Sequence, residues 1–432
     1  LGDMCRGPRI CDLAIAAAYV VLYQTDPEAA LEALVLGYHT VNPLQPEELD
    51  LLWPLLQMRL AVSVVNSAKM AQVDPDDPYV VISQAPAWQF LEQNTVHADL
   101  LLARLRVACG FPITPFAGAV HAYLKKMRGH FAPVIAANLS VAPMWSLSVE
   151  QSCVPVDPFE LSSSEAAQVV GALASEDAVC LGYYKEPRLI YTAPAFYKGP
   201  WKASDRRTVH LGIDVFAPQG TDISAPMTGR VHVVENRSTS LDYGGIIILL
   251  HEIPDGACFY TFYGHLDPSV CETLFIGQII QAGEVFCRLG GATQNGGWTP
   301  HLHFQLALTT KGLGKDWPGV ANADELGFWT QICPNPAALL NLPDEKVTYV
   351  PTDKAQVLAD RQAYFGANLT LSYADPVMFL RGWKHHLFDE WGRPYLDAYN
   401  NVPHVGHAHP RIQSVAADQL QRLNSNTRYL HP

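Results

Sequence analysis

The chain has 432 residues, 49% of them hydrophobic and 16% charged, and a formal net charge of −13. This length can hold two or three domains, and the composition is that of a globular protein rather than a disordered one. The negative charge argues against nucleic acid or an anionic membrane face as partner, because binding to either needs a basic surface.

The first residues predict that the chain is a fragment of a longer protein. It begins at Leu1 without a methionine, and residues 2–5 are typical of the middle of a chain. Residues 10–23 form the most apolar run, but the run is short for a bilayer span and carries Asp12 near its start, so we expect a buried helix. Nine cysteines without a C-x-x-C spacing suggest reduced thiols and a cytoplasmic location more than a disulfide framework.

Residues 1–108 predict an all-α lobe. Thr25-Asp26-Pro27-Glu28 places a capping residue and a first-turn proline before an apolar run, which is typical of a helix start. Three helices are expected after the first: residues 29–36 ended by Gly37, residues 45–70 with a break near Pro54, and residues 96–108.

The order Gly2-Asp3-Met4, residues 10–16 and Gly37-Tyr38 resembles the C-terminal helical lobe of aminoglycoside/choline-type phosphotransferases. In that family the catalytic loop and the magnesium-binding aspartate lie upstream of this lobe, and here they would fall before Leu1. Asp3 and Asp12 are therefore interpreted as structural, and we expect no phosphotransfer by this chain.

Residues 109–190 predict a linking subdomain without assignable chemistry. Ser162-Ser-Ser-Glu165 is a capping box that predicts a helix to about Ala174. Residues 182–184 and 189–192 are interpreted as strands that lead into the next domain.

Residues 191–345 carry three separated histidine segments. They are His210-Leu-Gly-Ile-Asp214, Tyr263-Gly-His265 and His301-Leu-His303. Because side chains alternate along a strand, His301 and His303 should share one face while Leu302 enters the core. His210 and Asp214 are four apart, so both can face one side of a strand or strand end, and Gly212 allows a close backbone approach.

A mixed set of histidine and aspartate ligands suits zinc, which binds nitrogen and carboxylate oxygen tetrahedrally. With three protein ligands the fourth position takes water, whose pKa the metal lowers toward neutrality. The alternative interpretation is a packed core histidine, which we prefer for His232 and His251.

The motifs at residues 210–308 resemble those of lysostaphin-type (LytM, M23) zinc metallopeptidases. The resemblance implies a small antiparallel β fold that cuts peptide bonds, usually in peptidoglycan. It further implies that His210, Asp214 and His303 bind Zn²⁺, and that His265 and His301 form an unligated catalytic pair. Residues 236–242 or 291–299 could cover the substrate groove.

The remaining pattern of residues 191–345 predicts mainly β structure. We expect two strands within residues 221–234, a hairpin of residues 245–251 and 258–266 across Pro254-Asp255-Gly256, a turn at residues 282–284, and a short helix after residues 334–336.

Residues 346–432 resemble the N-terminal part of class III pyridoxal-phosphate aminotransferases, which include ethanolamine-phosphate and phosphohydroxylysine phospho-lyases. The resemblance rests on Arg381-Gly-Trp383, residues 388–397 and residues 399–410. The family's cofactor lysine lies far downstream, so we expect pyridoxal phosphate, and a homodimer formed through this part, only in the full-length protein. His404, His407 and His409 have metal-like spacing, but the family uses this loop to shape a substrate pocket.

The sequence therefore predicts a multidomain chain with an all-α N-terminal lobe, a central antiparallel all-β metallopeptidase domain and an α/β aminotransferase-type fragment. Three functions stay open. The chain is a zinc peptidase or amidase acting on a peptide or peptidoglycan-like substrate, an internal piece of a kinase and aminotransferase or phospho-lyase fusion, or a peptide-binding module.

Overall fold

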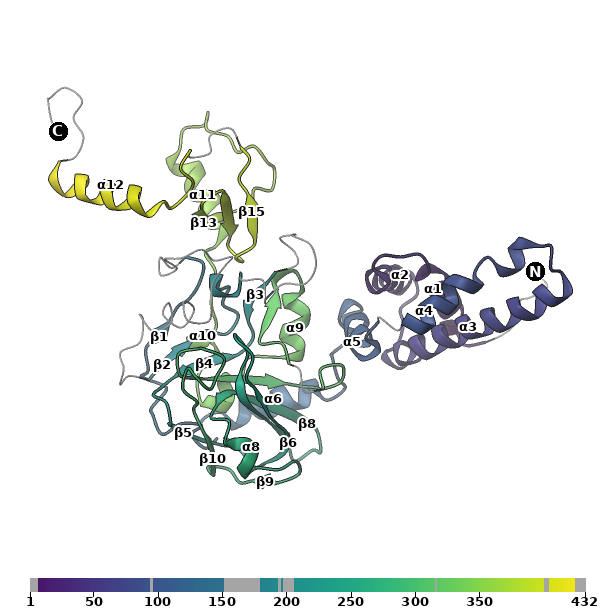
Figure 1. Cartoon of the computed structure of the whole chain (residues 1–432), viewed down its shortest axis with the longest axis horizontal. Coiled ribbons are helices and arrows are strands. Elements are labelled where there is room, and N and C mark those ends of the chain that lie inside the picture. The colour runs from purple at the N-terminus through teal and green to yellow at the C-terminus, as the bar shows by residue number, and fades with distance from the viewer. Residues whose placement is uncertain are drawn as a thin grey trace. The chain divides into compact units, whose positions relative to one another are not determined.

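A computed structural model of the chain describes residues 7–93, 96–150, 179–192, 196, 206–314, 317–399 and 404–423. The chain divides into two compact units, each of which is considered by itself (Figure 1). The helical unit comprises Leu1–Ala122 with residues 253–258 and 308–317, and the sheet unit comprises the remaining residues.

The helical unit has an apolar core built by one face of each helix. Its elements are α1 (Arg9–Val20), α2 (Pro27–Val41), α3 (Pro46–Val73), the 3₁₀ helix η1 (Pro78–Val81), α4 (Gln84–Gln93) and α5 (Ala98–Ala108), and α6 (Ala117–Met127) starts in it. The predicted N-cap at Asp26 is present, since its carboxylate accepts a hydrogen bond from the Ala29 backbone N–H. The lobe is helical as predicted, and no described helix has the length and apolar character needed to cross a bilayer.

Two predicted helix ends were wrong. Helix α2 continues through Gly37 to Val41, and α3 runs through Pro54 without a break. An interior glycine costs a helix only about 1 kcal/mol, which the burial of Leu31 and Val35 on the same helix offsets. Helix α3 likewise buries a leucine stripe on both sides of Pro54, so tertiary packing outweighs the local signal.

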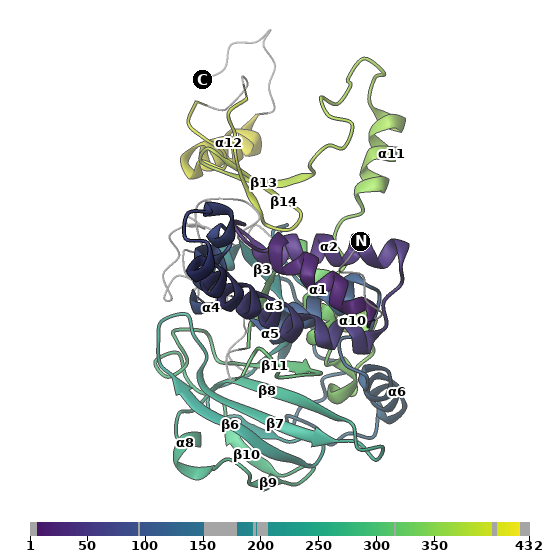
Figure 2. The ribbon, with the colours of Figure 1, turned by 90° about the vertical axis from the view of Figure 1, so that its right-hand side faces the viewer.

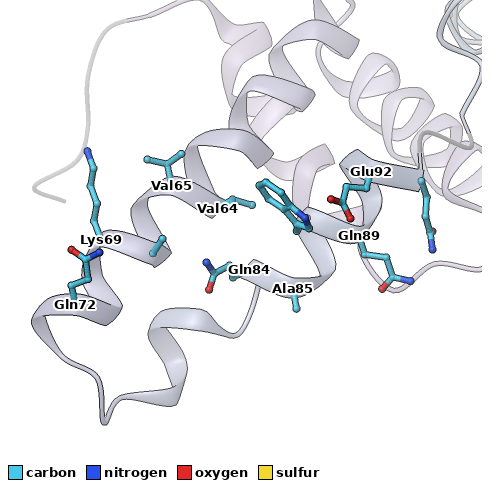
Figure 3. Close-up of a pocket in the computed structure, with 11 residues that line it drawn as sticks. Val64, Val65, Lys69, Gln72, Gln84, Ala85, Gln89 and Glu92 are labelled. Carbon is cyan, nitrogen blue, oxygen red and sulfur yellow. The ribbon is translucent and has the colours of Figure 1, made fainter.

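A groove of about 820 Å³ lies between α3 and α4 (Figure 3). Val64 and Val65 line it from α3, and Ala85 and Trp88 line it from α4. Polar and charged side chains flank these residues, among them Gln72, Gln84, Gln89 and Glu92. The groove is therefore an amphipathic surface feature of the helical unit.

The sheet unit is built on an eight-stranded sheet with the order β1-β2-β4-β11-β8-β7-β6-β9. Figure 2 shows its neighbouring strands β11, β8, β7 and β6. The pairings given for it are antiparallel except for β1 with β2. Two small antiparallel sheets, β10-β5 and β12-β3, complete the metallopeptidase-like region. The strands are β1 (Met144–Trp145), β2 (Cys180–Gly182), β3 (Arg207–His210), β4 (Ile213–Phe216), β5 (Asp222–Ser224), β6 (Gly229–Arg237), β7 (Gly244–Glu252), β8 (Cys258–Leu266), β9 (Ile279–Ile280), β10 (Val285–Arg288), β11 (His301–Ala307) and β12 (Val320–Asn322).

The predicted hairpin is confirmed, because β7 and β8 are neighbours in the sheet and Gly256 takes a positive φ of 80° in the turn between them. Residues 189–192 were predicted to be a strand but form the 3₁₀ helix η2 (Leu189–Thr192), in which the Tyr191 N–H donates to the Arg188 carbonyl. The helix predicted for residues 162–174 lies outside the described residues. Short helices follow the strands: α8 (Val270–Thr273), η5 (Ala323–Glu325), α9 (Leu326–Ile332), η6 (Ala337–Leu340) and α10 (Asp344–Val347).

The C-terminal segment mixes helices with a three-stranded sheet, as predicted. Its elements are α11 (Lys354–Tyr364), β13 (Phe379–Trp383), β14 (His386–Asp389), β15 (Pro394–Leu396) and α12 (Pro410–Arg422). Phe388 is fully buried against Val149 and Leu189, and the Thr208 hydroxyl donates to the Trp391 carbonyl at 2.5 Å. This part of the segment therefore shares a core with the strands that lead to the histidine cluster.

Candidate metal centre

The pairing of three strands brings the predicted site residues together. In the register of β11 with β4, His303 lies opposite Asp214, and in that of β11 with β8 it lies opposite Gly264, next to His265. His301 stands two residues before His303 on the same face of β11. All of the predicted site residues except His210 thus come from three adjacent strands of one sheet.

His210 reaches the cluster from the end of β3, which belongs to the small sheet with β12. His210 and Asp214 therefore lie on different strands, with the chain bending at Leu211 and Gly212 between them. The predicted role of Gly212 is confirmed: a Cβ there would lie 2.7 Å from His303 Cε1 and 2.9 Å from the Phe304 carbonyl oxygen. A side chain at this bend would displace His303.

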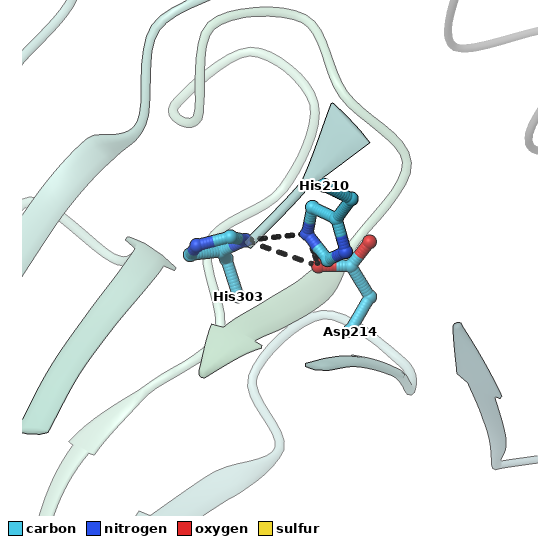
Figure 4. Close-up of side chains that lie close together, drawn as sticks. All are labelled: His210, Asp214 and His303. Atoms are coloured by element: carbon cyan, nitrogen blue, oxygen red, sulfur yellow. Dashed lines mark hydrogen bonds and ion pairs between the residues drawn. The ribbon is translucent and has the colours of Figure 1, made fainter. Parts of the chain in front are cut away.

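Three potential ligand atoms form a tight triangle (Figure 4). His210 Nε2 lies 2.9 Å from His303 Nδ1, and each of these nitrogens lies 3.2 Å from Asp214 Oδ1. Ligands about 2.0 Å from a tetrahedral zinc ion are about 3.3 Å apart, so the triangle has the size of one face of such a site. Among the described residues this is the one cluster of at least three such side chains with metal-binding geometry.

The outer nitrogens of His210 and His303 are already engaged. His210 Nδ1 lies 2.9 Å from the Tyr183 carbonyl oxygen, and His303 Nε2 lies 2.9 Å from Gln305 Oε1. Since these oxygens only accept, each outer nitrogen carries the proton and the inner nitrogen presents its lone pair to the centre of the triangle. This is the tautomer that a metal ligand requires.

Asp214 uses its two oxygens differently. Oδ1 faces the imidazoles, whereas Oδ2 accepts a hydrogen bond of 2.7 Å from Arg188 Nη1. Arg188 Nε donates to Glu186 at 2.7 Å, and both of these side chains are fully buried. Burial alone would raise the pKa of Asp214, but His210 and Arg188 outweigh it and hold that pKa well below its usual range.

His265 and His301 lie beside the triangle with their rings 4.2 Å apart. His301 Nδ1 lies 2.7 Å from the Thr299 carbonyl oxygen and His265 Nδ1 lies 3.3 Å from that of Asn295, so the Nε2 atoms are left for chemistry. His301 Nε2 is 3.8 Å from Asp214 Oδ1. His265 adopts a left-handed backbone with φ of 63°, which is uncommon for a residue other than glycine.

The whole cluster is withdrawn from solvent, since none of its five residues is more than 6% exposed. The Tyr243 ring lies 5.2 Å from that of His265 and 5.3 Å from that of His303, and Trp298 lies 6.2 Å from His265. Tyr243 directly follows one of the two loops that we expected to cover the site, and Trp298 lies within the other. An aromatic side chain within one predicted covering loop and another directly after the other loop therefore lie near the cluster.

Burial also sets the protonation of the imidazoles. It lowers the pKa of His210 to about 4, lowers that of His301, and lowers that of His265 well below its usual value. At neutral pH the imidazoles of His210, His265 and His301 are therefore neutral, and Asp214 is a carboxylate. Neutral histidine and ionised aspartate are the forms that bind a metal.

Several side chains that contact the cluster were not predicted from the sequence. Glu186 and Arg188 stand two apart, a spacing that would place them on one face of an extended segment. Gln305 stands two residues after His303 and follows the same alternation. Spacing alone could have identified Gln305, but Arg188 and its partner Asp214 are 26 residues apart, and local patterns do not reveal such contacts.

Two other described histidines of the sheet unit have partners of their own. His251 is buried and bonded to Thr228 and Thr261, which supports its interpretation as a core residue. His407 Nε2 lies 2.7 Å from Asp397 Oδ2 in the C-terminal segment. The seven described cysteines are free thiols.

Comparison with known proteins assigns the cluster to a family. The sequence model of Peptidase family M23 matches residues 208–313. A crystal structure of the catalytic domain of the prophage-encoded M23 protein EnpA from Enterococcus faecalis is 26% identical, and the alignment covers 31% of this chain and 87% of that one. Its TM-score is 0.20, a value too low to bear on the fold.

Other parts of the chain are similar to metabolic enzymes. It is 39% identical over 79 residues to an alanine-glyoxylate aminotransferase 2-like protein of Drosophila melanogaster, covering 18% of the chain and 16% of that protein. It is 32% identical over 96 residues to a hydroxylysine kinase of Xenopus laevis, covering 22% of the chain and 25% of the kinase. The chain spans a quarter or less of the length of these relatives. It thus contains a peptidase family M23 segment together with similarities to an aminotransferase-type protein and a hydroxylysine kinase.

Proposed function

We propose that the segment around residues 208–313 is a zinc-dependent peptidase. The observation that carries the proposal is the triangle of His210 Nε2, Asp214 Oδ1 and His303 Nδ1, which has the size and the donor atoms of a three-ligand zinc site. Two further neutral imidazoles stand beside it, and a structural zinc site would not need them. Catalytic zinc sites keep three protein ligands and one open position, which this arrangement matches.

In this proposal His210, Asp214 and His303 hold the ion. When bound, zinc would supply Lewis acidity that lowers the pKa of water and polarises a peptide carbonyl. The neutral Nε2 atoms of His265 and His301 would accept the proton of the attacking water and deliver it to the departing amine. The buried, low-dielectric surroundings strengthen each of these electrostatic interactions.

The substrate in this proposal is a peptide or a peptidoglycan-like strand. The five site residues are nearly fully buried, with Tyr243 and Trp298 beside them, so the proposal requires side chains around the cluster to move when an extended peptide binds. If these side chains closed again over the bound peptide, they would also exclude water from the reaction.

The first experiment is elemental analysis of the purified chain, with His303→Ala alongside. We expect about one zinc per chain in the parent and little in the variant, because zinc loses one of its three protein ligands. A panel of oligoglycine, stem-peptide and unrelated peptides is then tested for hydrolysis.

His265→Ala separates chemistry from metal binding. This variant should retain zinc and lose roughly 10²–10⁴-fold in hydrolysis, the usual contribution of a general acid or base. His251→Ala, a buried histidine outside the cluster, is the matched control and should keep the parent rate per folded molecule. Hydrolysis at the parent rate by His265→Ala would remove the proposed role of His265.

A second candidate function rests on the similarity to the aminotransferase-type protein and the hydroxylysine kinase. We propose as the alternative that the chain is an internal part of a multifunctional enzyme of amino alcohol or hydroxylated amino acid metabolism. The M23 segment would then be a structural or binding module. Sequencing the flanking coding region tests this: a phosphotransferase catalytic loop upstream and a cofactor lysine downstream are expected, and the absence of both would contradict it.

A further inference from the structure

Arg188 and Glu186 lie outside the residues that match the M23 family, yet Arg188 donates a hydrogen bond to Asp214 and another to Glu186. The segment that carries them runs beside β3: the His210 N–H donates to the Glu186 carbonyl and the Arg188 N–H donates to the Thr208 carbonyl, both at 2.9 Å. These two backbone hydrogen bonds thus fix the positions of both His210 and Arg188. We propose that Arg188 is a positioning residue that restricts Asp214 to a single-oxygen ligand, and that Glu186 holds Arg188 in place.

The two oxygens of Asp214 have different partners. A carboxylate can bind a metal through one oxygen or through both. Here Oδ2 accepts a 2.7 Å hydrogen bond from Arg188 Nη1, while Oδ1 lies 3.2 Å from the inner nitrogen of each histidine ligand. Engagement of Oδ2 turns the carboxylate so that only Oδ1 faces the centre. One oxygen and two nitrogens leave a fourth tetrahedral position open.

Arg188 is itself held in place by hydrogen bonds to Glu186 and Tyr191. Its Nε donates to Glu186 Oε2 at 2.7 Å, and Nη1 also donates to the Tyr191 hydroxyl at 3.0 Å. The other oxygen of Glu186 accepts from the Ser146 hydroxyl and the Leu147 N–H. The guanidinium is therefore held on two sides, so its direction toward Asp214 is fixed before any ion binds.

The buried charges of Glu186, Arg188 and Asp214 also leave a net negative charge for a cation. Glu186, Arg188 and Asp214 are each at most 2% exposed, so their charges are compensated by one another rather than by water. The Glu186 carboxylate neutralises Arg188, which leaves the single negative charge of Asp214 available to a cation. Without Glu186, the positive guanidinium would oppose cation binding.

Gly182 on β2 supports the same assignment independently. A Cβ at this position would lie 2.9 Å from Arg188 Nη2 and 3.2 Å from Asp214 Cβ. The strand opposite Asp214 therefore has no side chain where the guanidinium lies. Gly182→Ala should displace Arg188 without changing any charge.

The test measures zinc affinity by competition with a chromophoric chelator, together with the visible spectrum of the Co²⁺-substituted chain. Arg188→Met should weaken zinc binding roughly 10–100-fold, as loss of a residue that orients a metal ligand usually does. Arg188→Lys keeps the charge but loses the planar fork, and should recover part of the affinity. Gly182→Ala should weaken binding less than Arg188→Met does.

The cobalt spectrum reports coordination directly. Four-coordinate Co²⁺ absorbs visible light more strongly than five- or six-coordinate Co²⁺, so the parent should give the stronger bands. Arg188→Met should give weaker bands, because the freed Oδ2 can join Oδ1 on the ion. A merely structural arginine would not change this spectrum in a folded protein.

Arg188→Met leaves Glu186 buried and unpaired, and the variant could fail to fold for that reason alone. The double variant Glu186→Gln with Arg188→Met removes both charges and keeps the test decisive. Arg288→Met is the matched control, since Arg288 pairs with Asp222 at the exposed surface and should leave zinc affinity unchanged.

The inference rests on the proposed zinc site but not on peptide hydrolysis. A folded double variant with the zinc affinity and cobalt spectrum of the parent would overturn it, whatever the hydrolysis assays show. Weakened zinc binding and a changed spectrum would support it even if no peptide is cut, an outcome that would count only against the peptidase proposal. A parent chain that binds neither ion would overturn both.

Discussion

The helical unit and the sheet unit are stabilised in different ways. Among the described residues, Ser67 and Arg106 are the buried polar or charged side chains of the helical unit, and all the others belong to the sheet unit. An apolar core tolerates substitution of similar volume, whereas a buried polar group is costly unless each of its partners is present. The comparison indicates that the sheet unit gives up part of its stability to hold chemically active groups away from water.

The largest expected effect comes from removing Asp214, a buried charged side chain of the sheet unit. Asp214→Ala should lower zinc affinity by more than about 100-fold, because even residues that only orient a ligand contribute 10–100-fold. Chelator competition measures the affinity. Arg106→Ala in the helical unit is the control and should leave it unchanged; zinc binding within tenfold of the parent in Asp214→Ala would remove Asp214 from the ligand set.

The next effect tests whether the C-terminal segment belongs to the core of the sheet unit. Phe388 is fully buried against Val149 and Leu189, so Phe388→Ala should lower the free energy of unfolding by about 3–5 kcal/mol. Hydrogen exchange of β3 and β4 under increasing urea gives this quantity for the sheet unit. Leu396→Ala, at a side chain that is 67% exposed, should change it by less than about 0.5 kcal/mol. Equal effects of the two changes would show that the segment does not stabilise the sheet.

A smaller effect concerns pH. Burial lowers the pKa of His251 to about 4, whereas an unfolded histidine has a pKa of about 6.5. Between these values the unfolded chain binds the proton, so stability is complete above pH 6.5 and falls as the pH drops toward 4. His251 should therefore account for about 2 kcal/mol of the stability lost between pH 7 and pH 5.

Urea unfolding of the metal-free parent and of His251→Gln at both pH values measures this contribution. The variant should lose less stability on acidification than the parent. Parallel pH profiles would mean that His251 is equally easy to protonate in the folded and unfolded chains.

The smallest expected effect lies in the helical unit. Trp88 lines the groove between α3 and α4 and is 54% exposed, so Trp88→Ala should change the free energy of unfolding by less than about 1 kcal/mol and leave zinc affinity unchanged. Leu56→Ala, at a fully buried position of α3, should cost about 2–5 kcal/mol in the same assay. A large effect of Trp88→Ala would show that the groove is part of the core.

Strand alternation and motif order predicted much of the site. His301 and His303 stand two apart on one strand, and Gly212 makes the close approach that its neighbours suggested. The sequence does not reveal the role of Arg188. That role depends on backbone pairing with β3 and on a contact with Asp214 on another strand. The ligand and catalytic roles of the five residues stay predictions.

Among the helices and strands, the errors share one physical cause. Gly37 and Pro54 are local helix-breaking signals, but packing of buried leucines carries both helices past them. Residues 189–192 have strand-forming side chains, yet the Tyr191 N–H bonds back to the Arg188 carbonyl in a 3₁₀ turn. Local propensity decides such cases only where tertiary contacts are neutral.

The backbone of His265 bears on why a histidine stands there at all. A left-handed φ of 63° is strained by about 1 kcal/mol for a residue with a Cβ, and glycine would adopt it freely. For the backbone conformation alone glycine is the better residue at this position, but His265→Gly would also leave the space of a buried imidazole empty. The position therefore combines backbone strain with a buried ionisable side chain, a combination that is common at functional sites.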